Sequence, residues 1–520
     1  MNHVSRRAFI TQVGAGIAVS LLGIACDRFS NSASPEGPTP TTADARQPRS
    51  GGTFVLGTIA PIPNASPYPS SVGTRTFWWA MFDTLVRLDE RRQPVPHLAE
   101  SWTVSDDRLT LTFKLRPDVK FQSGRPFTAE QAKWSIEYGV DPKTGVTAGA
   151  ELKGVQVTAR DSSTLELRLP KVMPHVFALL MFIFMIDPES EVDRAPVGTG
   201  PFKMDGLDPG NELRMLKHQQ YWRADRPLLE GVTIRTVADA SALLVNLESG
   251  AVNAAYCLAS DVARVRANPH MTTLIAGGEG NYCYLMNVSA PPFDDRRIRQ
   301  ALSLALDRQR FATAVMYGLV EPSYVMWPRT SPAWDASQDI GEFNLDKARQ
   351  LLAAAGYPNG LETKIQTTTG EYPELFEFNQ VFQSDLASIN VNASIETLEF
   401  EQYVAIRNGA RFPAMLSHAY VYADSDPALA FTATPLRPNG NITHFTSDTY
   451  TQLVNAAKQE PDWNNRLALY HQIGLLLKDE AFLIPVANLV TPWAVRSNVQ
   501  GFRVLPTVST APVYEDLWLA

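Results

Sequence analysis

Strand-like and helix-like segments follow one another through this chain from about residue 51 onward, and this alternation limits the folds it can adopt. Leu and Phe alternate with polar residues over 109–115, and Leu does so over 165–169, as in half-buried strands. Thr128–Gln131 has the form of a capping box that opens a helix to Tyr138. Further helices are expected over 294–318, 346–355, 449–458 and 463–478, and a strand over 482–495. The sequence therefore predicts a mixed α/β fold with long-range returns of the chain, without internal repeats or a coiled coil.

Composition narrows the class of protein further. A chain of 520 residues is long enough for two or three domains. It is 45% hydrophobic and 19% charged, which is typical of a folded globular protein. The net charge of -8 and the lack of a basic block argue against nucleic acid as a partner.

Residues 1–25 are interpreted as an export signal. Arg6 and Arg7 precede Phe9 and the uncharged apolar run Val13–Ala25. This run is shorter than the roughly 20 residues that a membrane-spanning helix needs, and a charged start with a short apolar core is typical of a signal peptide. The arginine pair resembles a twin-arginine signal. A Sec signal that carries two arginines is the alternative.

Residues 26–50 are interpreted as a lipoprotein tether. The segment before Cys26 resembles a bacterial lipoprotein cleavage site, although Gly23 stands where that pattern has Leu. Fifteen of the 24 residues from 27 to 50 are Ser, Pro, Thr, Ala or Gly, a composition that does not fold by itself. Cleavage without lipid is the alternative. The longest later apolar run, Val176–Ile186, is too short to span a bilayer. Together with the export signal, this predicts that the body lies outside the cytoplasm, in the periplasm or on the outer face of the membrane.

Two cysteines, Cys257 and Cys283, follow Cys26 in the chain. In an oxidising compartment they could form a disulfide. Two separate buried thiols are an equally good interpretation, because the sequence does not place their backbones.

Motifs for catalysis and cofactors are missing. The sequence has no Gly-x-Ser-x-Gly elbow, no phosphate-binding Gly-x-x-x-x-Gly-Lys and no His-Glu-x-x-His. No two of the eight histidines are three to five residues apart, and no pair of carboxylates stands out as a glycosidase pair. We therefore expect no catalytic residues, no metal site and no cofactor.

The most suggestive polar stretch is Asp424-Ser-Asp426-Pro427. Asp before Pro is a good N-cap, so Asp426 is expected to cap a short helix over Pro427–Phe431. Asp424 then has no structural task of its own. It follows the aromatic, strand-like run 420–423, where a carboxylate can bind a cationic group of a ligand. A simple turn residue is the alternative for Asp424.

Several separated blocks resemble one family, the extracytoplasmic solute-binding proteins of peptide/nickel ABC transporters, often called family 5. The blocks occur in the expected order and cover about residues 51–500. They are Gly51–Leu56, Met81–Asp89, His97–Trp102, Leu111–Phe121, Gly124–Trp134, Val197–Phe202, Tyr221–Trp222, Leu243–Gly250, Asn287–Leu306, Ala348–Gly356 and Asp424–Pro427.

The resemblance implies a two-lobed Venus-flytrap fold with an extra domain and a ligand buried between the lobes. Lobe I would comprise 51–88, 199–275 and 485–520, the extra domain 89–198, and lobe II 276–484. An Asp at the position of Asp424 holds the α-ammonium of the ligand in related peptide binders. The resemblance further implies a monomer that hands its ligand to the permease subunits of an ABC transporter.

The expected mechanism is closure of the lobes on a solute, stabilised by the preference of the ligand for the closed state. Aromatic side chains would line the cleft, and core packing is the alternative for each of them. The candidates are Trp78, Trp79, Tyr284, Trp327 and Tyr422, with Arg329 and Arg437 as candidate partners of a ligand carboxylate.

The ligand is expected to be an oligopeptide first, a carbohydrate second and a metal chelate third. Two other classes stay open. One is a secreted hydrolase, which needs catalytic groups that converge in the cleft. The other is a sensor or chaperone lipoprotein that shares the fold but serves no transporter.

Overall fold

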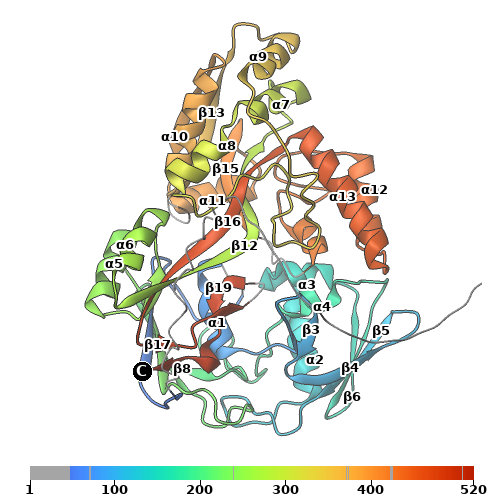
Figure 1. Ribbon diagram of the computed structural model, residues 1–520. Helices are drawn as coiled ribbons and strands as arrows, with labels where there is room; N and C mark the ends of the chain where they lie inside the picture. The colour runs from blue at the N-terminus through green and yellow to red at the C-terminus, as the bar shows by residue number, and fades with distance from the viewer. Residues whose placement is uncertain are drawn as a thin grey trace, which may run out of the picture. The chain divides into compact units, whose positions relative to one another are not determined.

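The computed structural model describes residues 47–68, 72–237, 239–369, 372, 374–421, 426–505 and 508–520 (Figure 1). The proposed export signal, Cys26 and most of the tether lie outside the described residues, as do Tyr422 and Asp424. The segment Pro48–Ala520 forms one compact unit. Among the described residues, no helix is both long and apolar enough to cross a membrane.

A mixed sheet dominates the described part of the chain, and the expectation of an α/β fold is confirmed. Its ten strands run in the order β14-β13-β15-β12-β16-β11-β1-β10-β9-β8. The bounds are β1 Thr53–Thr58, β8 Phe202–Asp208, β9 Glu212–Lys217, β10 Gly231–Thr236, β11 Ala254–Tyr256, β12 Met271–Met286, β13 Leu361–Thr367, β14 Val391–Thr397, β15 Met415–Val421 and β16 Leu483–Arg496. β1 pairs in parallel with β10 and β11, whereas β12 pairs antiparallel with β15 and β16.

The two longest strands, β12 and β16, connect the two halves of this sheet and can be followed side by side in Figure 1. Their pairing extends from Met271 opposite Arg496 to Leu285 opposite Leu483. One end of β16 also pairs with β11, next to β1, while β12 pairs with β15. The expected strand over 482–495 is therefore confirmed as β16, and it lies at the centre of the sheet.

A four-stranded antiparallel sheet forms within residues 99–168 in the order β4-β5-β7-β6. Its strands are β4 Ala99–Val104, β5 Thr110–Leu115, β6 Gln156–Asp161 and β7 Thr164–Arg168. The apolar residues of the two predicted strands are buried except Leu109, which is half-buried, and helix α2 (Ala129–Val140) begins at the predicted capping box of Thr128 and Gln131. Both local expectations are confirmed.

One continuous hydrophobic core joins this small sheet to β1 and its neighbours. A buried carboxylate, Asp83, lies within the same region. It accepts hydrogen bonds from Trp222 Nε1 at 3.0 Å, Thr199 Oγ1 at 3.2 Å and Tyr221 OH at 3.3 Å, and His97 Nε2 lies 2.8 Å from it. Residues from four separate stretches of the chain are thereby fixed around one charge.

The other half of the large sheet is covered by helices, with two further cores among β12–β16. Besides α2, the α-helices of the described residues are α1 Val72–Met81, α3 Thr147–Glu151, α4 Val176–Leu180, α5 Ala240–Ser249, α6 Val262–Ala267, α7 Arg296–Ala305, α8 Arg308–Arg310, α9 Leu345–Ala354, α10 Glu374–Ala387, α11 Phe400–Asn408, α12 Asp448–Ala457 and α13 Trp463–Glu480. The short strand pairs are β2 Val86–Leu88 with β3 Pro94–Pro96, β17 Val499–Gln500 with β20 Trp518–Leu519, and β18 Val504–Leu505 with β19 Val508–Pro512. The 3₁₀ helices are η1 Pro142–Thr144, η2 Ala259–Asp261, η4 Pro427–Thr432 and η5 Tyr514–Asp516, and η3 Phe311–Val315 is a π-helical segment.

The helices expected over 346–355, 449–458 and 463–478 are confirmed as α9, α12 and α13. The single helix expected over 294–318 is wrong, because α7 ends at Ala305 and Leu306 is extended. Asp307 starts a new helical turn by accepting a hydrogen bond from the Arg310 backbone N–H. The buried Arg308 side chain donates to the carbonyl oxygens of Ser323 and Pro485, which fixes the chain in the broken geometry.

Candidate functional site

The crossing of β12 and β16 contains an irregularity that sets the geometry between the two halves of the sheet. Gly277 pairs with Val490, but the next pair is Asn281 with Asn488, so β12 carries two extra residues there. Gly277 and Gly278 have φ values of +124° and +97°, a backbone region that suits glycine. A Cβ on Gly278 would collide with Thr330, and one on Gly277 would lie 2.7 Å from the Leu489 carbonyl oxygen. The bulge therefore requires glycine at both positions.

A polar network beside this bulge ties together β12, β15, β16 and the segment that follows η3. Asn488 Nδ2 donates to Asn281 Oδ1 at 2.8 Å, and Asn281 Nδ2 donates to the Met326 carbonyl at 2.6 Å. Tyr420 OH donates to the same carbonyl at 3.0 Å. Val421, the last residue of β15, pairs with Gly280. The chain therefore leaves β15 beside the bulge, and the segment with Tyr422 and Asp424 follows, outside the described residues.

Asp426 has the capping role expected from the sequence. Its carboxylate accepts from the Ala428 backbone N–H at 2.9 Å at the start of η4, which confirms the predicted cap. It also accepts from Tyr470 OH at 3.1 Å and lies 3.4 Å from Arg466 Nη2. Burial, and then the charge of Asp426, raises the pKa of Tyr470 well above its usual value, while the charge of Arg466 opposes the shift.

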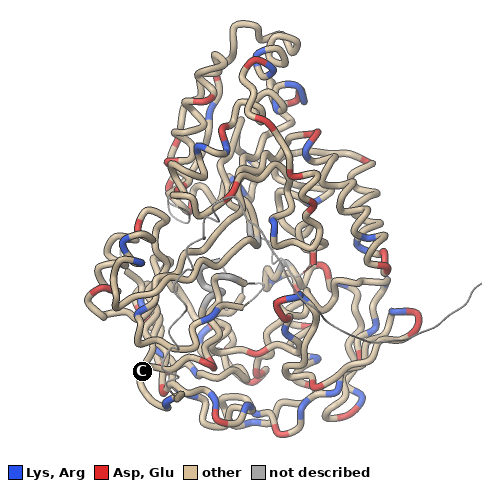
Figure 2. The backbone as a smooth tube through the Cα atoms, in the orientation of Figure 1, with Lys and Arg blue, Asp and Glu red and all other residues tan. Residues whose placement is uncertain are grey.

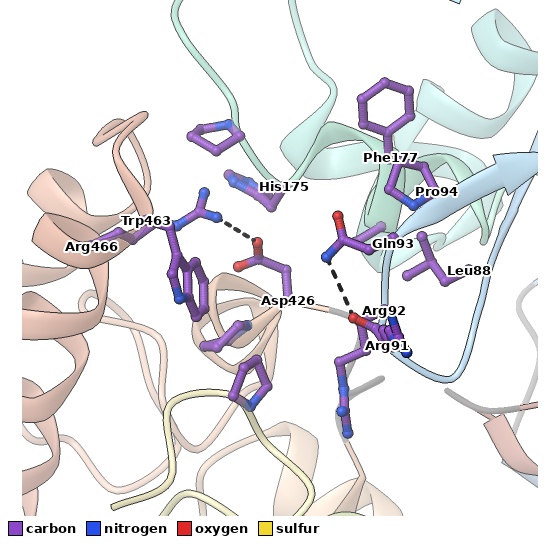
Figure 3. Close-up of a pocket in the computed structure, with 14 residues that line it drawn as sticks. Leu88, Arg91, Arg92, Gln93, Pro94, His175, Phe177, Asp426, Trp463 and Arg466 are labelled. Carbon is purple, nitrogen blue, oxygen red and sulfur yellow. Dashed lines mark hydrogen bonds and ion pairs between the residues drawn. The ribbon is translucent and has the colours of Figure 1, made fainter. Parts of the chain in front are cut away.

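A cavity of about 330 Å³ lies where segments 88–94, 174–178, 426–427 and 463–466 meet (Figure 3). We call it the junction pocket. Its lining residues are Leu88, Arg91, Arg92, Gln93, Pro94, Pro174, His175, Phe177, Ala178, Pro332, Asp426, Pro427, Trp463 and Arg466. Figure 3 shows His175 and Arg466 converging on Asp426.

His175 and Arg466 are buried at 3% and 8% exposure. Both ring nitrogens of His175 lack a hydrogen-bond partner among the described residues, and so do Nε and Nη1 of Arg466. Burial lowers the pKa of His175 to about 4, with the charges of Lys458 and Arg466 adding to the effect and that of Asp426 opposing it. The imidazole is therefore neutral at neutral pH.

Four of the aromatic residues proposed for the ligand are in the described part of the chain and are buried. Trp78 and Trp79 belong to α1, and neither indole N–H has an acceptor among the described residues. Tyr284 packs against Phe378 and Phe382, with ring centroids 4.5 and 4.4 Å away.

Trp327 donates from Nε1 to the Tyr470 carbonyl at 3.2 Å. For Tyr284 and Trp327 these contacts are those of core packing, the alternative considered from the sequence. A direct role of the four aromatic residues in ligand contact stays a prediction.

The proposed arginines and cysteines lie elsewhere. Arg329 is half-exposed, pairs with Glu321 and lies over the Trp334 ring at 5.5 Å, and Arg437 Nε donates to the Thr432 carbonyl at 2.9 Å. Cys257 and Cys283 are free and buried, so the interpretation as separate thiols agrees with the structure. Burial raises the pKa of the Cys257 thiol to about 12.

Sequence reasoning missed His175 and Arg466 as parts of one pocket. Trp463 and Arg466 are three residues apart on α13, and the Arg466 guanidinium lies 5.0 Å from the Trp463 ring. A spacing of three residues on a helix predicts that the two side chains lie on the same face, and this was the local signal for their contact. His175 comes from a distant stretch, and no local pattern connects it to Asp426.

Residues 93–441 match the model of the bacterial extracellular solute-binding proteins, family 5. The chain belongs to this family. The expected membership is thereby confirmed, and with it a solute-binding protein of the type that serves peptide/nickel ABC transporters. The family consists of transporter binding proteins that act outside the cytoplasm.

Curated relatives include heme-binding protein A of Haemophilus influenzae, 27% identical over 452 residues that cover 79% of this chain and 82% of the relative. The dipeptide-binding protein DppE of Bacillus subtilis is 27% identical, covering 78% of this chain and 81% of the relative. The glutathione-binding protein GsiB of Shigella dysenteriae is 29% identical, covering 84% and 88%.

Solved structures of similar fold include a dipeptide-binding protein from Pseudoalteromonas in complex with Met-Leu. Its TM-score is 0.81 at 19% identity, and the match covers 90% of this chain and 100% of that one. The oligopeptide-binding protein AppA of Bacillus subtilis with a nonapeptide gives 0.80 at 21% identity, covering 91% and 100%. These likenesses confirm the two-lobed fold of family 5 binding proteins.

Proposed function

We propose that this protein captures an oligopeptide between its two lobes and delivers it to an ABC permease for import. The observation that carries the proposal is the crossing of β12 and β16, where two halves of one sheet are joined at a glycine bulge. A bulge of this kind bends the sheet and permits a change of angle between the halves. Peptide is favoured as the solute because DppE and two of the solved relatives are described as peptide binders.

Binding of the solute would then drive closure of the two lobes. A solute that contacts both lobes binds the closed form more tightly and shifts the population toward it. Asp424 is the proposed anchor of the solute's ammonium group, since it follows β15, whose end lies beside the bulge. Tyr422 is its proposed aromatic neighbour.

Export and anchoring complete the proposal. Residues 1–25 direct export by the twin-arginine route, and Cys26 carries the lipid that holds the protein at the membrane. Replacing Cys26 with Ser is expected to move the protein from the membrane fraction to the soluble extracytoplasmic fraction, with loss of the acyl mass from the N-terminal peptide. Equal membrane retention of the C26S variant would contradict the anchor.

The solute is tested by thermal shift with the purified full-length protein against peptide, oligosaccharide and metal-chelate libraries, followed by mass spectrometry of the released ligand. A ligand that binds the native state raises the melting temperature. The expected result is stabilisation by peptides that are recovered intact, lost in Asp424→Ala and kept in the exposed control Asp106→Ala.

Other outcomes point elsewhere. Stabilisation by a sugar or chelate would retain the transport function and reject the ammonium anchor. Recovery of a cleaved peptide would favour a hydrolase.

A further inference from the structure

The junction pocket presents hydrogen-bond donors without acceptors. Arg466 uses Nη2 toward Asp426, while its Nε and Nη1 atoms are buried and unpartnered among the described residues. His175 is 3% exposed, and neither of its nitrogens has a partner there. A neutral imidazole always carries one N–H donor, so the pocket holds at least two side chains that need an acceptor.

Asp426 does not meet this need. Its carboxylate already accepts from the Ala428 backbone N–H and from Tyr470 OH, and pairs with Arg466 Nη2. It neutralises the charge of Arg466 but leaves the buried Nε and Nη1 atoms without an acceptor among the described residues. Arg91 stands exposed at the rim and adds a positive charge. The missing partner is therefore an anionic acceptor.

Part of the remaining wall is apolar, beside Arg92 and Gln93. Leu88, Phe177, Ala178 and Pro427 line the cavity together with the face of Trp463, whose ring is stacked under the Arg466 guanidinium. Pockets of about 300 Å³ and more with a few placed polar groups are typical of small-ligand sites. The volume of about 330 Å³ fits a molecule of one ring or one side chain.

We propose that the junction pocket is a binding subsite for a carboxylate attached to a small apolar group. The carboxylate accepts from Arg466 Nε and Nη1 and from His175, and the apolar part lies against Trp463 and Phe177. A planar guanidinium holds a carboxylate through two parallel hydrogen bonds, which favours a carboxylate over a neutral amide. The carboxylate belongs either to a free small molecule or to the solute captured under the proposed function.

The first test uses phenylacetate, with phenylacetamide and benzylamine as neutral and cationic counterparts, titrated calorimetrically into the full-length protein. Phenylacetate is expected to bind with a Kd of about 1 mM or tighter. Phenylacetamide should bind about ten-fold more weakly because it offers no charge to Arg466. Equal binding of all three compounds, or no binding of phenylacetate, overturns the proposal.

The second test locates the binding. In protein labelled with ¹⁵N-histidine, the His175 signal is identified by its loss in His175→Gln, and phenylacetate is expected to shift it while benzylamine leaves it unchanged. Phenylacetate binding that shifts other histidines and leaves the His175 signal in place overturns the assignment to this pocket.

The variants separate charge from geometry. Arg466→Lys keeps a positive charge beside Asp426 but removes the planar guanidinium that donates two parallel hydrogen bonds. Arg91→Gln removes the exposed positive charge at the rim of the pocket. Both should weaken phenylacetate binding, about ten-fold and about three-fold respectively, while the exposed Arg194→Gln changes nothing. Unchanged affinity in Arg91→Gln and Arg466→Lys overturns the proposal even if His175→Gln does not fold.

The source of the carboxylate is distinguished with tripeptide libraries that have free or amidated C-termini. If the solute supplies it, amidation lowers affinity in the wild type and has no effect in Arg466→Lys. If amidation has no effect while phenylacetate binds, a free carboxylate is the ligand. The phenylacetate result stands apart from the proposed function, so a failure of peptide capture leaves this test intact.

Discussion

At the scale of single residues, Asp83 shows how a buried charge is held. Burial by itself would raise its pKa, but the charge and hydrogen bond of His97, the charge of Arg87 and the Trp222 hydrogen bond outweigh it and lower the pKa to about 2. A carboxyl whose pKa is lower in the folded state binds protons more readily when unfolded. Its contribution to stability is therefore present above pH 3.8 and is lost as the pH falls toward 2.

This residue gives a prediction for acid unfolding. Asp83→Asn should lower the unfolding free energy at pH 7 by about 3 kcal/mol, since it removes one partner of a buried charged cluster. It should also flatten the loss of stability between about pH 4 and pH 2, which amounts to about 2 kcal/mol for this carboxyl. Urea unfolding across this pH range is the measurement. A variant with the same acid dependence as the wild type would contradict the role of Asp83, and Asp106→Asn is the exposed control.

The residues predicted from sequence and those missed differ in the range of their contacts. Asp426 was predicted as a cap because its acceptor role involves Ala428, two residues away. Asp83 depends on partners up to residue 222, and His175 meets Arg466 only through the fold. Spacing along the sequence predicts contacts between residues a few positions apart, but it does not predict contacts between distant segments that the fold brings together.

At the scale of elements, the bulge of β12 is the feature that constrains sequence most. Gly278 and Gly356 share a φ of +97°, but a Cβ would collide with Thr330 at Gly278 and meets nothing within 4 Å at Gly356. The two positions form a matched pair. They differ in the steric contact at the crossing and agree in φ.

Replacing each glycine with Ala should separate these effects. Gly356→Ala is expected to lower the unfolding free energy by about 1 kcal/mol, because Ala disfavours the positive φ at this position. Gly278→Ala should lower the unfolding free energy by about 2 kcal/mol more than Gly356→Ala does, because Thr330 must move. This movement would strain the hydrogen bond of 2.5 Å that Thr330 Oγ1 donates to the Gly278 carbonyl oxygen. Chemical denaturation of both variants measures the difference. Equal costs would show that the crossing tolerates a side chain.

Elements with local start and stop signals were predicted to within about two residues. α9 begins after Asn344, whose side chain accepts from Lys347, and the chain after its end turns at Gly356 with positive φ. The expected helix over 294–318 failed because Arg308 donates to carbonyl groups at 323 and 485. A periodic apolar stripe does not reveal a break that distant carbonyl groups enforce.

At the scale of the whole molecule, an ion pair links segments assigned in our domain proposal to the extra domain and lobe II. Lys458 Nζ lies 3.0 Å from both carboxylate oxygens of Glu151, with side chains 10% and 28% exposed. Figure 2 shows that charged residues otherwise lie scattered along the backbone. A pair of this kind, away from the crossing, stabilises the arrangement in which these two segments touch.

We expect this pair to favour the closed form. Lys458→Glu should weaken solute binding about five-fold, in line with about 1 kcal/mol for a partly buried pair, and the exchange Lys458→Glu with Glu151→Lys should restore it. Solute titration and small-angle scattering of the free protein measure affinity and closure. A loss of affinity that the double exchange does not repair would indicate local damage instead.

The two-lobed fold was predicted from the order of sequence blocks and is confirmed, whereas hydrophobic periodicity predicted the α/β class alone. The bounds of lobes and extra domain stay a prediction. The shared core of β1 and the small sheet is not visible in the sequence, because its members come from many separated stretches.

The position of β16 also has a consequence for how the chain acquires its fold during synthesis. In the sheet order, β16 is the strand between β12 and β11, so the strands made before residue 483 form two separate half-sheets, each with an open edge. Unpaired edges invite pairing with other chains. The nascent polypeptide must therefore protect two edges until Leu483–Arg496 leaves the ribosome. Truncation before β16 should yield an aggregating product, with soluble protein recovered when the missing segment is supplied as a peptide.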